Sequence, residues 1–174
     1  GSIGVAVFPH QGHNEDALLR HADLAMYHAK ELGGNQYQVF SEHMNARAVE
    51  RMTIETELRV AIEEDQFALH YQPQLRLADQ ALSGMEALVR WNHPRLGLLG
   101  PARFIALAED SGLIWALGLK VMEMAVAQMA AWRAKGLAVP RVAVNVSPMQ
   151  LRPDLVDAIA AILDRHGVPA ECLE

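Results

Sequence analysis

A glutamate and an arginine stand four positions apart in an otherwise largely apolar run, Glu86 and Arg90 within residues 82–91. Successive side chains of a β-strand point to opposite faces, so these two would share one face with Leu88. A carboxylate is a ligand that hard cations such as Mg²⁺ accept, and a guanidinium can neutralise a phosphate. The pattern predicts either a cation and phosphate site or an ordinary surface ion pair on a half-exposed strand.

A further oxygen donor occurs on a later predicted strand, residues 141–147, which is followed by Pro148. Valines alternate there with Ala143, Asn145 and Ser147, which places Asn145 on the less apolar face. In a barrel of parallel strands, polar residues near the carboxyl ends converge on one mouth, where such barrels keep their active sites. Asn145 and Glu86 are therefore candidate metal ligands, and they need further ligands to complete a site.

The hydrophobic periodicity predicts alternating strands and helices that could position these residues. Strands are expected at residues 2–8, 37–40, 67–72, 82–91 and 141–147, with another beginning at 172. Helices are expected at residues 14–33, 41–65, 101–112, 113–135 and 153–166, with a loop at 97–100. This order is typical of an α/β fold with a parallel sheet or barrel.

The bulk composition narrows the classes of function. Of the 174 residues 51% are hydrophobic and 21% charged, which is typical of globular protein and allows one or two domains. The net charge of −6 and the lack of a Lys/Arg run argue against a nucleic-acid polymer as partner. With Cys172 as the single cysteine, no disulfide framework is expected. The apolar segment 113–132 contains Lys120 and Glu123, which favours a buried helix over a membrane span.

Residues 84–94, Gly-Met-Glu-Ala-Leu-Val-Arg-Trp-Asn-His-Pro, closely resemble the signature of EAL domains. The match continues through Tyr71-Gln72-Pro73 upstream and Asn145-Val146-Ser147-Pro148 downstream. The resemblance implies a modified TIM barrel whose first strand runs antiparallel. It also implies hydrolysis of cyclic di-GMP to linear pGpG, with Mg²⁺ or Mn²⁺ as cofactor.

The same resemblance assigns roles to individual residues. Glu86 matches the catalytic, metal-binding glutamate that names the family, and Asn145 matches a second metal ligand. Arg90, the backbone beside Leu88, and Gln72 match contacts to the cyclic dinucleotide. The implied mechanism is attack of a metal-activated water on the phosphodiester.

The first 40 residues resemble the end of a GGDEF domain, a family that condenses two GTP molecules into cyclic di-GMP. The matching strings lie at residues 2–6, 22–27, 29–30 and 33–35. Lys30 matches a lysine that meets the nucleotide phosphates, whereas Gly34 stands where the family often has a phosphate-binding arginine. We therefore expect the C-terminal part of a GGDEF domain at 1–40, a helical linker at 41–64, and the N-terminal half of an EAL domain at 65–174.

The resemblance leaves three functions open for a complete parent protein. It could be an active phosphodiesterase, a catalytically inactive cyclic di-GMP receptor, or a bifunctional tandem whose GGDEF part binds GTP and regulates the EAL part. We expect the chain alone to be inactive, because the family's other metal ligands belong beyond the position of Glu174. The parent is expected to be a cytoplasmic homodimer, with an upstream membrane anchor as an alternative.

Overall fold

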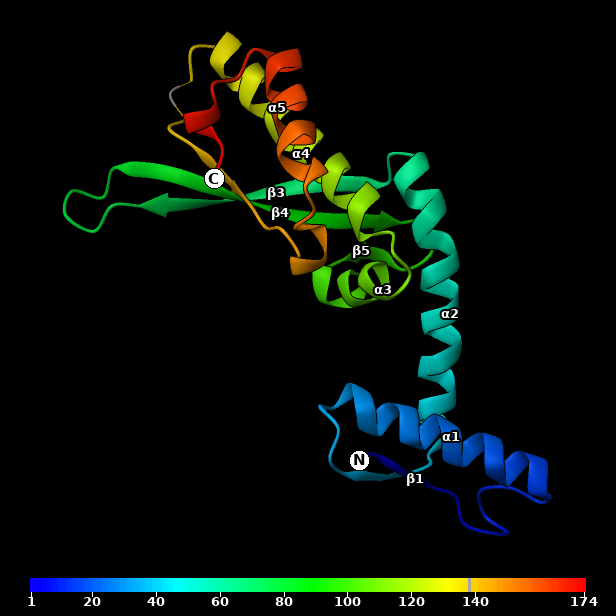
Figure 1. Ribbon diagram of the computed structural model, residues 1–174. Coiled ribbons are helices and arrows are strands. Elements are labelled where there is room, and N and C mark those ends of the chain that lie inside the picture. The colour runs from blue at the N-terminus through cyan, green and yellow to red at the C-terminus, as the bar shows by residue number, and fades with distance from the viewer. Residues whose placement is uncertain (138) are drawn as a thin grey trace. The chain divides into compact units, whose positions relative to one another are not determined.

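The computed structural model describes residues 1–137 and 139–174, which divide into two compact units (Figure 1). We call residues 1–54 the N-terminal unit and residues 55–174 the C-terminal unit. Helix α2 (Glu42–Glu63) begins in the first unit and ends in the second. It matches the helix predicted at residues 41–65 to within two residues at each end.

In the N-terminal unit, strands β1 (Ile3–Val5) and β2 (Tyr37–Val39) pair in parallel and are connected through helix α1 (Glu15–Glu31). The side chain of Asn14 caps α1 by accepting a hydrogen bond from the Ala17 backbone N–H at 2.9 Å. The helix lies so close to β1 that a Cβ on Gly4 would be 1.8 Å from the Ala22 carbonyl oxygen. Only glycine fits at the centre of this strand.

The first strand is shorter than predicted for residues 2–8. The chain turns at Val7, whose carbonyl accepts a hydrogen bond from the Gln11 backbone N–H at 2.8 Å. The Val7 N–H donates to the Gln11 side chain at the same distance. These local bonds replace a strand ladder, and Phe8 is left 65% exposed. The prediction of a buried strand through Phe8 was wrong.

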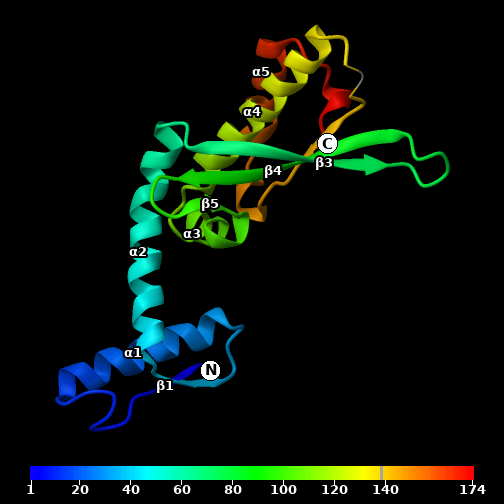
Figure 2. The same ribbon diagram turned by 180° about the vertical axis from the view of Figure 1, so that it is seen from behind.

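The C-terminal unit is built on a mixed sheet of strands β3 (Phe67–Leu75), β4 (Leu82–His93), β5 (Gly97–Leu99) and β6 (Val142–Val144). β3 runs antiparallel to β4, and β6 runs parallel to it. The antiparallel first strand implied by the family resemblance is thus present. The β3–β4 hairpin projects past the helices, as Figures 1 and 2 show from opposite sides.

The loop predicted at residues 97–100 is instead strand β5. It pairs antiparallel with the end of β4, with Leu99 opposite Trp91 and Gly97 opposite His93. β4 continues two residues beyond the predicted end, and the positive φ of 70° at Gly97 suits the tight return. A three-residue strand has too little pattern to be recognised from sequence.

The helix predicted at residues 101–112 is two shorter pieces, the 3₁₀-helix η1 (Pro101–Arg103) and helix α3 (Ile105–Asp110). Phe104 separates them, with φ −137° and a fully buried side chain. Its ring packs against Phe67 at 5.7 Å and Trp91 at 5.8 Å between centroids. Burial of this ring is a tertiary contact that outweighs the local helical periodicity.

Strand β6 ends at Val144, three residues before the predicted end. Ser147 then caps the 3₁₀-helix η2 (Pro148–Gln150), which precedes helix α5 (Asp154–His166). The 3₁₀-helix η3 (Ala170–Cys172) follows, and Leu173 forms a parallel bridge with Val142. The chain therefore starts another parallel pairing where a strand was predicted.

Helix α4 (Ile114–Ala134) packs against α5 and against the sheet. By length and composition it could cross a membrane, a test that the core helices of soluble proteins also pass; no other helix in the described residues does so. Its buried side chains are Ile114, Leu117, Val121, Met122, Ala125, Val126 and Met129.

The C-terminal end of α2 is fixed within the C-terminal unit by α4 and β4. Lys120 of α4 donates a hydrogen bond to the Ile62 carbonyl at 2.6 Å and pairs with Asp65 at 2.5 Å. A lysine at this position satisfies a carbonyl that the helix end leaves open. Glu57 and the buried His93 lie 2.6 Å apart, which ties the same helix to the end of β4.

Candidate functional site

Glu86 lies at the centre of the sheet, between Gln72 of β3 and Ala143 of β6. Strand alternation places Glu86, Leu88 and Arg90 on one face of β4, as predicted, and all three are half-buried. Ala87 and Trp91 face the other way and are 3% and 0% exposed. The face that carries Glu86 is thus the accessible one, and the opposite face belongs to the core.

Glu86 and Asn145 meet, as predicted for residues at the carboxyl ends of parallel strands. The Asn145 side-chain amide donates a hydrogen bond to Glu86 Oε1 at 2.7 Å, although the two are 59 residues apart in sequence. Asn145 is the residue after β6, one step beyond the Ala87–Val144 pair. Turning its amide would direct Oδ1 toward the same point as the Glu86 carboxylate.

Arg90 does not form the surface ion pair with Glu86 that the sequence left open. Its Nη1 donates to the carbonyl of Val89 at 2.8 Å, and no carboxylate contacts Arg90 among the described residues. A half-buried guanidinium without an anionic partner has spare donors for a phosphate. Gln72 is exposed on the same face, directly opposite Glu86.

Lys30 belongs to the N-terminal unit, where it is exposed in the last turn of α1. Lys30 and Glu86 thus belong to different units of the chain.

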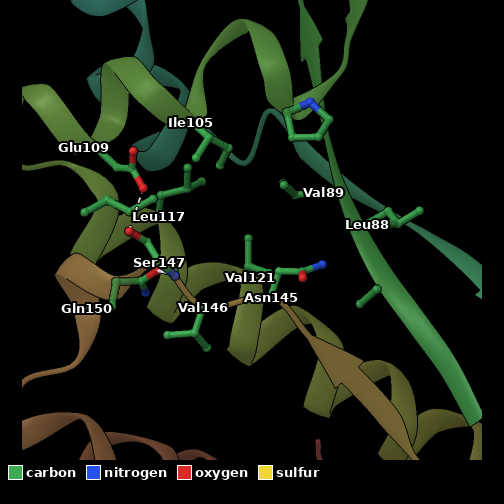
Figure 3. A pocket seen from close by; sticks show the side chains of 14 residues that line it. Leu88, Val89, Ile105, Glu109, Leu117, Val121, Asn145, Val146, Ser147 and Gln150 are labelled. Atoms are coloured by element: carbon green, nitrogen blue, oxygen red, sulfur yellow. Dashed lines mark hydrogen bonds between the residues drawn. The ribbon is translucent and has the colours of Figure 1, made fainter. Parts of the chain in front are cut away.

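A pocket of about 300 Å³ lies where the pairing of β4 with β6 stops (Figure 3). Beyond the pair of Ala87 with Val144, strand β4 and the segment that follows β6 separate. Helices α3, α4 and η2 enclose the space between them. Its walls are largely apolar, and its polar groups come from Glu109, Asn145, Ser147 and Gln150. The pocket is thus continuous with the candidate metal ligand Asn145.

The sequence analysis missed Glu109 and Gln150, and it placed Ser147 in the strand. In the structure Ser147 Oγ donates to Glu109 Oε1 at 2.6 Å, and Gln150 is 4% exposed. The spacing Ser147-Pro148-Met149-Gln150 is a capping-box pattern and could have revealed the short helix. The contact with Glu109 has no such local signal.

Glu86 and Asn145 are ligands of the type that a hard divalent cation accepts, but two ligands do not complete a metal site. Glu86 supplies a carboxylate and Asn145 an amide oxygen, both of which Mg²⁺ and similar ions accept. No group of three or more His, Cys, Asp or Glu residues that could hold a metal ion occurs in the part of the chain that the structure describes. Glu86 and Asn145 could therefore provide only part of a coordination shell of about six ligands.

Burial affects one titratable group near the sheet. Desolvation raises the pKa of Tyr71 to about 12. Tyr71 pairs with Ala87 across β3 and β4, and its ring meets Trp132 of α4 edge-on at 4.8 Å. It therefore belongs to the core face, whereas its neighbour Gln72 belongs to the accessible face.

The EAL domain family model matches residues 55–174. The chain belongs to the EAL domain family. Among curated relatives, the cyclic di-GMP phosphodiesterase PdeR of Escherichia coli (strain K12) is 48% identical over 150 residues, which are 86% of this chain and 22% of PdeR. The bifunctional diguanylate cyclase/cyclic di-GMP phosphodiesterase MucR of Pseudomonas aeruginosa is 42% identical over 168 residues, 96% of this chain and 24% of MucR.

The solved structures include the MucR phosphodiesterase in complex with c-di-GMP. It is 39% identical to this EAL chain, with a TM-score of 0.66, and the match covers 70% of this chain and 49% of that one. The homologues of this EAL domain thus include proteins named as cyclic di-GMP phosphodiesterases, and structural neighbours bind c-di-GMP. The chain spans only about a quarter of the length of these curated relatives.

Proposed function

We propose that this chain contributes the first strands of an EAL phosphodiesterase site that hydrolyses cyclic di-GMP to the linear dinucleotide. The observation that carries the proposal is the contact of Glu86 with Asn145 on the accessible side of the sheet, at 2.7 Å. The names of PdeR and MucR, at more than 40% identity, support the same reaction.

The proposed roles combine the family resemblance with the positions of the residues in the sheet. Glu86 and Asn145 would hold a divalent cation, Mg²⁺ or Mn²⁺, together with ligands from outside this chain. When bound, that cation would supply an activated water for attack on the phosphodiester. The Arg90 guanidinium would bind a phosphate, and Gln72 and the backbone beside Leu88 would contact the dinucleotide.

We also propose that residues 1–40 are the C-terminal part of a GGDEF domain and that 41–64 form the linker before the EAL part at 65–174. The match to MucR, named as a bifunctional cyclase and phosphodiesterase, is longer than the C-terminal unit and extends into these residues. Lys30 is the proposed contact to a GTP phosphate. The proposed setting is a cytoplasmic homodimer.

The test of the phosphodiesterase is the change Glu86→Gln in the full-length protein that carries this chain. The amide keeps the size of the side chain but loses the charge that binds a cation. Hydrolysis, followed as release of the linear dinucleotide at saturating Mg²⁺ or Mn²⁺, should fall about 10²-fold or more. The control is Asp157→Asn, the same chemical change at an exposed position of α5, which should keep full turnover.

Near-normal turnover by Glu86→Gln would overturn the assignment of this residue. The receptor alternative gives a different result: the unaltered full-length protein would bind cyclic di-GMP and release no linear product. The structure favours the enzyme only through the intact pair of Glu86 and Asn145.

A further inference from the structure

We propose that Glu109 is a positioning residue that holds the metal ligand Asn145 in place through Ser147. The inference rests on the proposed metal site and adds to it a residue from helix α3, 38 positions away in sequence from Ser147. Asn145 directly follows Val144, the last residue of β6 that pairs with β4, so the ladder holds Asn145 from one side only. Its position also depends on what holds the residues that follow.

Ser147 is the point at which this segment is tied down. Its Oγ accepts a hydrogen bond from the Met149 backbone N–H at 3.2 Å and donates its proton to Glu109 Oε1 at 2.6 Å. The hydroxyl therefore uses its donor on the carboxylate and an acceptor on the turn. A hydrogen bond to a charged group is the stronger kind, and the apolar walls of the pocket strengthen it further.

Gln150 closes the turn from the other side. Its side-chain oxygen accepts from the Ser147 backbone N–H at 3.0 Å, which completes the capping box. Its amide nitrogen lies against Gly118 of α4, where a Cβ would stand 1.7 Å from it. The turn is thus fitted against α4 by Gln150 and against α3 by Glu109, as Figure 3 shows for Ser147 and Glu109.

This arrangement resembles the outer-sphere hydrogen bonds that orient metal ligands in other proteins, whose loss typically weakens metal binding or activity by about 10–100-fold. Ser147, the partner of Glu109, is separated from the ligand Asn145 by the single residue Val146. Without the Glu109 bond, the segment would keep its fold through Gln150 but lose the constraint that aims Asn145 at Glu86.

The experiment measures Mn²⁺ affinity of the full-length protein by electron paramagnetic resonance of the free ion, independently of turnover. Glu109→Ala and Ser147→Ala should each weaken Mn²⁺ binding about 10-fold. Glu109→Gln keeps an oxygen that can accept from Ser147, so its affinity should stay within about twofold of the unaltered protein. Ser147→Ala removes the bond from the other end, which keeps the test valid if Glu109→Ala fails to fold.

Ser111→Ala is the matched control. Ser111 follows the same helix, and its Oγ donates to the Leu107 carbonyl at 2.6 Å, but it does not line the pocket. Its loss should leave Mn²⁺ affinity unchanged. The double variant Glu109→Ala/Ser147→Ala should bind Mn²⁺ no more weakly than either single variant, because both remove one interaction.

Several results would overturn the inference. Glu109→Gln losing as much affinity as Glu109→Ala would mean that the charge, not the hydrogen bond, matters. Additive losses in the double variant would mean that Glu109 does not act through Ser147. Unchanged Mn²⁺ affinity in Glu109→Ala would exclude the positioning role and leave the metal site intact. An unaltered protein that binds no Mn²⁺ would instead refute the proposed function.

Discussion

The two faces of strand β4 differ in environment although their residues alternate along one short stretch of chain. Trp91 is fully buried on one face, where its ring packs against Phe67 and Phe104 and its Nε1 donates to Gln66 at 3.0 Å. Arg90, the preceding residue, lies on the other face with unused donors. One face of the strand therefore packs into the core, and the other face carries the residues proposed to contact the ligand.

The largest effect that we expect from a single substitution is a loss of stability at Trp91, on the buried face of β4. Trp91→Ala removes a fully buried ring from an aromatic cluster, so the free energy of unfolding should fall by about 3–5 kcal/mol. Denaturant unfolding of the protein measures the loss. Trp91→Phe serves as a milder variant that keeps part of the packing, should the alanine variant fail to fold.

The control for Trp91 is Leu98→Ala on β5, where the leucine is 55% exposed. This change should alter the free energy of unfolding by no more than about 0.5 kcal/mol. Equal losses from Leu98 and Trp91 would mean that the core does not lie on the face described above.

The second-largest expected effect is a loss of ligand affinity on substitution of a residue on the accessible face. Arg90→Ala in the full-length protein should weaken cyclic di-GMP binding by about 1.5–3 kcal/mol, the scale of a hydrogen bond to a charged group. Calorimetric titration measures the affinity, and denaturant unfolding should show little change, in contrast to Trp91→Ala. Unchanged affinity would mean that Arg90 is an ordinary surface residue that does not bind a phosphate of the ligand.

The smallest expected effect distinguishes Tyr71 from its neighbour Gln72 on the opposite face. Because burial raises the pKa of Tyr71 to about 12, the folded protein holds the phenol proton at pH values where the unfolded chain, with a pKa near 10, releases it. This contribution to stability is complete below pH 10 and is lost as the pH rises toward 12.

Tyr71→Phe removes that titration. The stability of the unaltered protein relative to the phenylalanine variant should therefore decline between about pH 10 and 12 and be constant below that range. Unfolding free energies of both proteins across this interval provide the measurement. Parallel curves would show that the Tyr71 ring is solvated rather than packed against Trp132.

The parts of the fold that sequence analysis predicted are those with local causes. The alternation around Glu86 follows from the period of a strand, and α1 begins directly after its N-cap Asn14. The break at Phe104 was missed because the ring is buried against Phe67 and Trp91, which are distant in sequence. The partnership of Ser147 with Glu109 was missed for the same reason, since it joins two helical segments 38 residues apart.

The most direct test of the metal site is a crystal structure of the full-length protein with Mn²⁺, in which the ion is located by its anomalous scattering. We predict a peak bonded to a Glu86 carboxylate oxygen and to Asn145 Oδ1 at about 2.1 Å, the distance typical of small divalent ions. The Asn145 amide would then be turned from its present orientation toward Glu86. A peak elsewhere, or none with the hydrogen bond between Asn145 and Glu86 retained, would contradict the account.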